Sequence, residues 1–193
     1  MKKVSIITIM FCAVLTLAGC GLRELVNLIN CKFSLANISD ITWAGINFSE
    51  INSISDLSLA NLQKATKAIK EKDWNVGCNV NVNVKNETPR PAKLVAFDYD
   101  LLLENTSVAT GEYKDKSYVI NPSSVTKVPV PLKANVVNVF KKGEVGNIIN
   151  LARNLTNYGN GKESNVKIKL TPYATLANSN QKLPTITLNK TFQ

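Results

Sequence analysis

The sequence contains no histidine among its 193 residues. Because histidine is the commonest general base near neutral pH and the commonest zinc ligand, this absence removes the usual forms of acid–base and zinc chemistry. The sequence also lacks a glycine-rich phosphate loop, a nucleophile elbow and a haem-attachment motif. These absences exclude the best-marked classes of enzyme and favour a binding or structural role.

Long apolar runs are also missing, since none reaches the roughly 20 residues that a membrane-spanning helix needs. One run of about 14 residues, from Val4 to Leu17, follows two lysines and leads into Leu17-Ala18-Gly19-Cys20. A short apolar segment with this ending is typical of a bacterial lipoprotein signal and its lipobox. We therefore expect removal of residues 1–19 and attachment of diacylglycerol to the Cys20 thiol. The alternative is an uncleaved anchor helix with an incidental cysteine.

Cysteine is scarce, with four residues in the whole chain. Cys12 lies in the signal and Cys20 is the expected lipidation site, so Cys31 and Cys78 remain. In an oxidising compartment these two could form one disulfide. Two buried free thiols are the equal alternative, because cysteine packs well on an apolar face. Two thiols without histidine predict no metal site.

Acidic residues are fewer than basic ones, 14 against 23, and the net charge is +9. The basic residues are scattered, and an exported chain rarely meets nucleic acid, so we expect no nucleic-acid partner. A basic surface suits contact with anionic lipid headgroups, or it serves solubility alone. We assign residues 20–31 to a lipidated tether and residues 32–193 to a single domain.

The most regular pattern is the alternation of cysteine or valine with asparagine from Cys78 to Val84. A side-chain period of two places the apolar residues on one face, as in a half-buried antiparallel strand. Alternation predicts further strands at residues 33–48 (with a break near Ser39-Asp40), 95–104, 107–113, 128–136, 166–170 and 186–192. Pro129 and Pro131 remove hydrogen-bond donors, which predicts an edge position for their strand.

The period changes to three and four residues between Ser55 and Asp73, and again between Val145 and Leu155, which predicts two amphipathic helices. Asp56 or Ser58 is available to cap the first helix. This helix should pack on the sheet, with a membrane-surface position as the alternative. About seven strands and two helices predict a mainly β fold, a β-sandwich with helices at one end or opening. A sheet with helices on one face is the competing arrangement.

The region from Val76 to Val136 resembles the water stress and hypersensitive response (WHy) domain of late embryogenesis abundant (LEA) type 2 proteins. Four segments carry the resemblance: residues 80–89, 94–101, 108–111 and 123–132. The first carries an Asn-x-x-Pro turn at Asn86, where the family usually has Asn-Pro-Asn. The resemblance implies a fibronectin- or immunoglobulin-like Greek-key sandwich of seven strands with a helix near one end. It implies no catalytic site, and the plant members are associated with desiccation and other stresses.

Two functional hypotheses follow. The first is a non-catalytic, lipid-anchored envelope protein that binds a partner, such as an envelope protein, or protects other molecules under stress. The second is a carrier of an apolar ligand or lipid in a cavity between the sheets and the helices, which a filled core would contradict. Gly21 follows Cys20 in place of the aspartate associated with inner-membrane retention, so we expect an outer-membrane location.

A third, weaker hypothesis is an enzyme. Asp98 and Asp100 lie on one face of a predicted strand, about 7 Å apart, and could form a glycosidase-like pair. Two solvated carboxylates are the favoured interpretation. Adding Glu104 gives a possible calcium site, but no loop supplies the carbonyl ligands that calcium needs. We therefore expect no catalytic residue and no cofactor.

Overall fold

The computed structural model describes residues 26–48, 51, 53–139, 145–155, 163–176 and 179–192. The predicted signal at residues 1–19, Cys20 and the first part of the tether lie outside these ranges. The described residues form a mainly β structure with eleven strands, which confirms the predicted fold class. None of their helices combines the length and the apolar character that crossing a membrane requires.

The first sheet consists of four antiparallel strands, β1 (Lys32–Trp43), β2 (Ile46–Asn47), β3 (Asn75–Asn86) and β8 (Ser124–Asn135). Their order is β2-β1-β3-β8. The predicted alternating strand is the centre of β3, and every residue of β3 pairs with β8 without a register shift. Pro129 and Pro131 lie on β8 at the end of this order, as predicted for an edge strand.

The second sheet contains β5 (Ala96–Leu103), β6 (Thr106–Tyr113), β9 (Ser164–Leu176), β10 (Ser179–Lys182) and β11 (Ile186–Phe192). Its order is β10-β9-β5-β6, and β11 also pairs with β9. Glu104 and Asn105 connect β5 to β6 with φ angles of 49° and 64°, as in the tight turns that suit hairpins. A small third sheet pairs β4 (Ala92–Leu94) with β7 (Tyr118–Ile120), which alternation did not predict.

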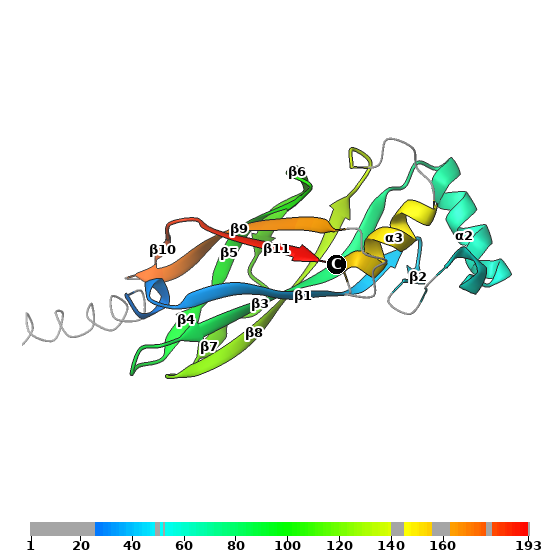
Figure 1. Ribbon diagram of the computed structural model, residues 1–193. Coiled ribbons are helices and arrows are strands. Elements are labelled where there is room, and N and C mark those ends of the chain that lie inside the picture. Colours follow the sequence, from blue (N-terminus) through cyan, green and yellow to red (C-terminus); the bar gives the residue numbers. More distant parts are fainter. Residues whose placement is uncertain are drawn as a thin grey trace, which may run out of the picture.

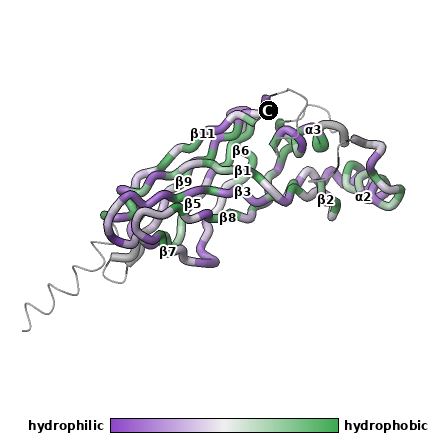
Figure 2. Tube along the Cα trace, turned by 60° about the horizontal axis from the view of Figure 1, so that its bottom comes forward, coloured by the Kyte–Doolittle hydropathy of each residue, from purple (hydrophilic) through white to green (hydrophobic). Residues whose placement is uncertain are grey.

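The two large sheets pack face to face in an elongated sandwich (Figure 1). Hydrophobic and hydrophilic residues alternate along the strands (Figure 2), because successive side chains point to opposite faces. On β3 the inward-facing Val80, Val82 and Val84 are only 0–2% exposed. The core therefore lies between the sheets, where the sequence pattern places it.

The first strand has the break that the sequence predicts. The register of β1 with β3 shifts between Ser39 and Thr42, and Asp40 adopts a φ of 54°. Aspartate tolerates this left-handed conformation better than most residues, because its short side chain can hydrogen-bond locally. Beyond the break, β1 continues to Trp43 and turns into β2 through Ala44 and Gly45, both with positive φ.

Helices α2 (Leu59–Lys70) and α3 (Val145–Leu155) lie together at one end of the sandwich, preceded by the short 3-10 helix η1 (Ile54–Asp56) (Figure 1). Ser58 caps α2, since its Oγ accepts a hydrogen bond from the Asn61 backbone N–H at 3.2 Å. The helical turn at residues 26–30, called the N-terminal turn below, lies at the opposite end (Figure 1). Helices thus cover one end of the sandwich, as predicted, and not one face.

Asn86 ends β3 with a fully buried side chain. Its Nδ2 donates to the carbonyl oxygens of Arg90 and Ile120 at 2.8 and 2.9 Å, and its Oδ1 accepts from the backbone N–H and the hydroxyl of Thr88. One side chain therefore folds the turn at residues 86–91 and joins it to β7. Asn86 and Pro89 allowed the turn to be predicted from the sequence. The contact with Ile120 could not be predicted, because this residue lies 34 positions away in the chain.

Replacing Asn86 by alanine should destabilise the fold by about 2–4 kcal/mol, because the buried Ile120 carbonyl loses its hydrogen bond and the Arg90 carbonyl and the Thr88 N–H each lose one as well. The free energy of unfolding in urea measures this change. Asn83→Ala on the outer face of β3 is the matched control and should cost less than about 0.5 kcal/mol. Equal losses in the two variants would contradict this structural role of Asn86.

Candidate functional sites

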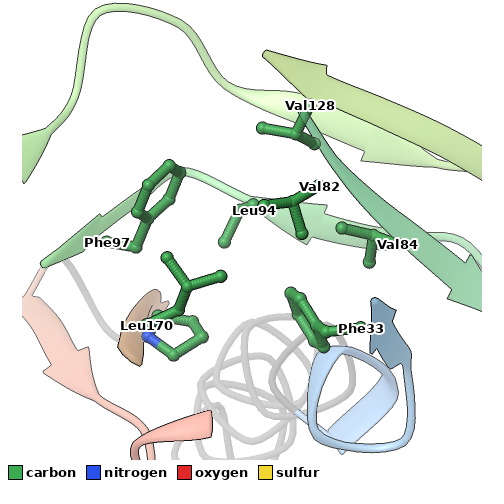
Figure 3. Close-up of a pocket in the computed structure, with 8 residues that line it drawn as sticks. Phe33, Val82, Val84, Leu94, Phe97, Val128 and Leu170 are labelled. Carbon is green, nitrogen blue, oxygen red and sulfur yellow. The ribbon is translucent and has the colours of Figure 1, made fainter. Parts of the chain in front are cut away.

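Among the described residues, side chains from both sheets pack closely around two small interior cavities. Eight residues line a cavity of about 10 Å³: Phe33, Val82, Val84, Leu94, Phe97, Val128, Leu170 and Pro172 (Figure 3). A second cavity, between the sheets and α3, measures about 30 Å³. Such volumes hold one or two water molecules at most, whereas ligand pockets usually measure roughly 300 Å³ or more. These described cavities therefore do not support the hypothesis of an apolar-ligand carrier.

The outer face of β3 carries Asn75, Gly77, Asn79, Asn81 and Asn83, and this set is called the asparagine face below. Amide groups on it bond across the strands. Asn79 Nδ2 donates to Asp40 Oδ2 at 2.8 Å, and Asn81 Nδ2 donates to Ser39 Oγ at 3.1 Å. Hydrogen bonds from Asn79 and Ser39 lower the pKa of Asp40. These side-chain hydrogen bonds therefore join β3 to β1 across the asparagine face.

Two open hollows of about 420 and 450 Å³ lie along this face and share Thr42, Gly77 and Lys133. A Cβ atom at Gly77 would lie 2.7 Å from Thr42 Oγ1, so any larger residue there would have to displace the Thr42 side chain. Polar residues contribute to both linings: Asp73 and Asn75 to the smaller hollow, Asp40 and Asn79 to the larger, and Lys133 to both. The hollows are large enough for a polar group of a partner, in contrast to the interior.

Asp98 and Asp100 lie on β5, as predicted, but each is already engaged by other side chains. Asp98 accepts hydrogen bonds from Tyr173 Oη at 2.6 Å and from Lys182 Nζ at 2.8 Å. Asp100 accepts from Ser107 Oγ at 2.6 Å, and its carboxylate lies 3.6 Å from Lys169 Nζ. Lys182 and then Tyr173 lower the pKa of Asp98, so this carboxyl is ionised near neutral pH and poorly suited to act as a general acid.

The third carboxylate of the possible calcium site binds elsewhere. Glu104 accepts hydrogen bonds from the backbone N–H of Asn165 at 2.7 Å and from its side-chain amide at 3.3 Å. Within the part of the chain that the structure describes, no three acidic, cysteine or histidine side chains form a group suited to a metal ion. Asp98, Asp100 and Glu104 therefore each bind different partners within the fold and do not converge on one site.

Asp98→Asn tests the ion pair with Lys182. Because the folded pKa of Asp98 lies below its unfolded value of about 3.9, its contribution to stability is present above that pH and lost as the pH falls through the folded pKa. The variant should be slightly less stable than the parent at neutral pH, and the difference should shrink below about pH 4. Urea unfolding at a series of pH values measures it.

Asp115→Asn, in the exposed turn before β7, is the control for losing one surface carboxylate. A pH-independent difference between Asp98→Asn and the parent protein would show that the pair with Lys182 does not form in solution.

Cys31 and Cys78 are free and buried in the structure, which corresponds to the second of the two equal alternatives, a pair of buried thiols. Lys32 pairs with Lys85 near one end of β3, whereas Cys78 lies near the other end. The antiparallel register therefore separates the cysteines by about 25 Å along the strand, far beyond the roughly 7 Å limit for two bridged Cα atoms. Burial raises the pKa of the Cys78 thiol to about 12.

The mature chain carrying Cys20→Ser should show two reactive thiols after unfolding in denaturant without reductant. In the folded protein, Cys78 should react far more slowly, because its thiol is buried and protonated. Titration with a chromogenic thiol reagent measures both results. A chain that releases thiols only after reduction would contradict the antiparallel register of β1 and β3.

The N-terminal turn packs on the domain, although the predicted lipidation site lies outside the described residues. Leu28 is 1% exposed, and Asn27 Nδ2 donates to the Pro91 carbonyl at 3.0 Å. Val26 and Ile29 of the same turn remain 51% and 54% exposed. Only a short segment of chain therefore separates Cys20 from Val26, where the folded domain begins. Because an extended chain covers about 3.5 Å per residue, these two residues can lie at most roughly 20 Å apart.

Comparisons with known proteins give weak likenesses. No known family profile matches the sequence, and a search of curated proteins finds no match. Among solved structures, a protein from Archaeoglobus fulgidus is 15% identical, with a TM-score of 0.38 over 82% of this chain and 96% of its own. A candidate LEA protein is 11% identical, with a TM-score of 0.43 over 96% and 83% of the two chains.

A candidate lipoprotein from Bacillus subtilis is 13% identical, with a TM-score of 0.35. The match covers 83% of this chain but only 36% of the Bacillus protein. Similarities at this level do not establish a shared function. The function of this chain is therefore argued from its own residues.

Proposed function

We propose that this chain is a lipid-anchored protein of the bacterial cell envelope, and that its sandwich is a non-catalytic binding module. The observation that carries the proposal is the sequence Leu17-Ala18-Gly19-Cys20 after a short apolar segment. A folded domain begins only a few residues later, at the N-terminal turn. This arrangement fits a secreted domain that a lipid on Cys20 holds close to a membrane surface.

The state of the polar groups supports a non-catalytic role. Asp98 and Asp100 each accept a hydrogen bond and each lie beside a lysine, so neither carboxylate is available as an unpartnered acid or base. Cys78 is buried with a raised pKa, which makes it a poor nucleophile. These described carboxylates and this thiol thus serve contacts within the fold.

The asparagine face is the described surface best suited to bind a partner. Its hollows are open and lined by both polar and apolar groups, whereas the described cavities of the interior are close to the size of a water molecule. Amide, hydroxyl and lysine groups there can donate and accept hydrogen bonds. A polar partner of the envelope therefore suits this face better than an apolar ligand suits the core.

Two finer points belong to the same proposal. The resemblance of residues 80–89, 94–101, 108–111 and 123–132 to the WHy domain favours a protective role under stress. Gly21, in place of an aspartate after the lipidated cysteine, favours the outer membrane. Fractionation of inner and outer membranes tests the location, and growth of a deletion strain under osmotic stress tests the role.

Metabolic labelling with a palmitate analogue tests the anchor. The parent protein should carry label and float with membranes, whereas Cys20→Ala should lose both label and membrane association, because it lacks the acceptor thiol. Cys12→Ala, inside the apolar segment, is the matched control and should keep the label. Label that survives in Cys20→Ala would overturn the proposed anchor.

A further inference from the structure

Exposed apolar side chains gather at the end of the sandwich that carries the N-terminal turn. The described residues leave six large hydrophobic side chains exposed, and four of them lie here: Val26, Ile29, Val119 and Val125. The other two, Leu59 and Val137, lie toward the helical end, on α2 and just after β8. Isolated exposed aliphatic side chains are ordinary, but four at one end form a pattern.

Strand pairing shows how these residues come together. Val125 pairs with Lys85, and Lys85 pairs in turn with Lys32, so the three residues form a row across β8, β3 and β1. Val119 pairs with Lys93 in the small sheet. The carbonyl of the neighbouring Ile120 accepts a hydrogen bond from Asn86, which places Val119 near the 86–91 turn. The same turn contacts the N-terminal turn, because the Pro91 carbonyl accepts a hydrogen bond from Asn27.

Basic residues accompany the apolar ones. Lys32, Lys85, Arg90 and Lys93 lie on these same strands and turns. Glu87 is the acidic residue among them, and its carboxylate forms ion pairs with Lys32 at 2.6 Å and Lys85 at 2.9 Å. Arg90 and Lys93 are exposed. The four exposed apolar and four basic residues are together called the proximal face.

We propose that the proximal face lies against the anionic headgroups of the membrane that carries the protein. A surface of apolar side chains and cations is what the lipid interface favours, since aliphatic groups enter the acyl boundary while lysine and arginine attract anionic lipid. The inference rests on the proposed anchor at Cys20. The short chain between Cys20 and Val26 keeps this end, and not the helical end, within roughly 20 Å of the bilayer.

This placement also decides between the two interpretations of the first helix. The lysines of α2 lie at the other end of the sandwich (Figure 1), about 40 Å away by the length of β3. Ala65 and Ala68 of α2 are buried against the domain. The structure thus packs α2 on the sandwich. The surface suited to the membrane is formed instead by several strands and turns, so the hydropathy of a single segment does not reveal it.

Vesicle sedimentation of the mature chain with Cys20→Ser, which carries no lipid, tests the proposal. The protein should bind vesicles that contain phosphatidylglycerol more tightly than pure phosphatidylcholine vesicles, and salt should weaken the binding. Arg90→Glu with Lys93→Glu should weaken it at least tenfold, because each cation near such a surface contributes about fivefold. Lys64→Glu with Lys67→Glu on α2 makes the same change in net charge and should leave binding within about twofold of the parent.

Equal losses in the two double variants, or no preference for anionic vesicles, would overturn the proposal. Circular dichroism should show that all variants stay folded. The anchor is tested separately, because the sedimentation protein has no lipid. Failure of vesicle binding with successful palmitate labelling would reject the proximal face alone, whereas failed labelling would reject the proposed function.

A second readout places individual residues. Val119→Trp on the proximal face should be quenched by brominated lipids, whereas Val137→Trp should not, although both valines are about half exposed. The native Trp43 and Trp74 lie near α2 and give the same background in both variants. Quenching at Val137 and not at Val119 would reverse the orientation and overturn the proposal.

Discussion

The structure depends on the pairing of β3 along both of its edges. All of its residues pair with β8, and most of them pair with β1 on the other side. Because a slip of one residue would turn Val80, Val82 and Val84 outward and bury the asparagines, the hydrophobic pattern holds the register firmly. The end of this strand then positions Asn86, which forms the 86–91 turn and attaches β7.

Much of this architecture could be predicted from the sequence, where the pattern is local. Alternation located β3, β5 and β6, the prolines placed β8 at an edge, and Ser58 was one of two candidates to cap α2. The short strands β4, β7 and β10 escaped prediction, because three or four residues show too little periodicity. The separation of Cys31 from Cys78 follows from strand register, which no spacing along the chain reveals.

The candidate sites show the same limit. Asp98 and Asp100 were correctly placed on one strand, but their partners Tyr173, Lys182 and Lys169 come from strands much later in the chain. The close packing around the described interior cavities likewise results from contacts between strands far apart in the sequence. The sequence therefore indicated which chemical groups were available, and the tertiary structure decided that they serve contacts within the fold.

The two ends of the sandwich differ in a way that suits an anchored module. The N-terminal turn is fixed to the domain by Leu28 and Asn27 beside exposed valines and cations, whereas the helices cover the opposite end. The asparagine face runs along the side between them. An anchored protein built in this way would contact the bilayer with one end and leave its polar face open to a partner.

Hydrogen exchange of the lipidated protein on anionic vesicles, compared with the lipid-free chain, tests this arrangement most directly. The account predicts slower exchange on the membrane in residues 26–30, 87–91 and 121–125, and no change in α2. The central amides of β3 should exchange slowest in both samples, because they are bonded in the middle of the sheet. Protection of α2 by the membrane, with none at the N-terminal turn, would contradict the account.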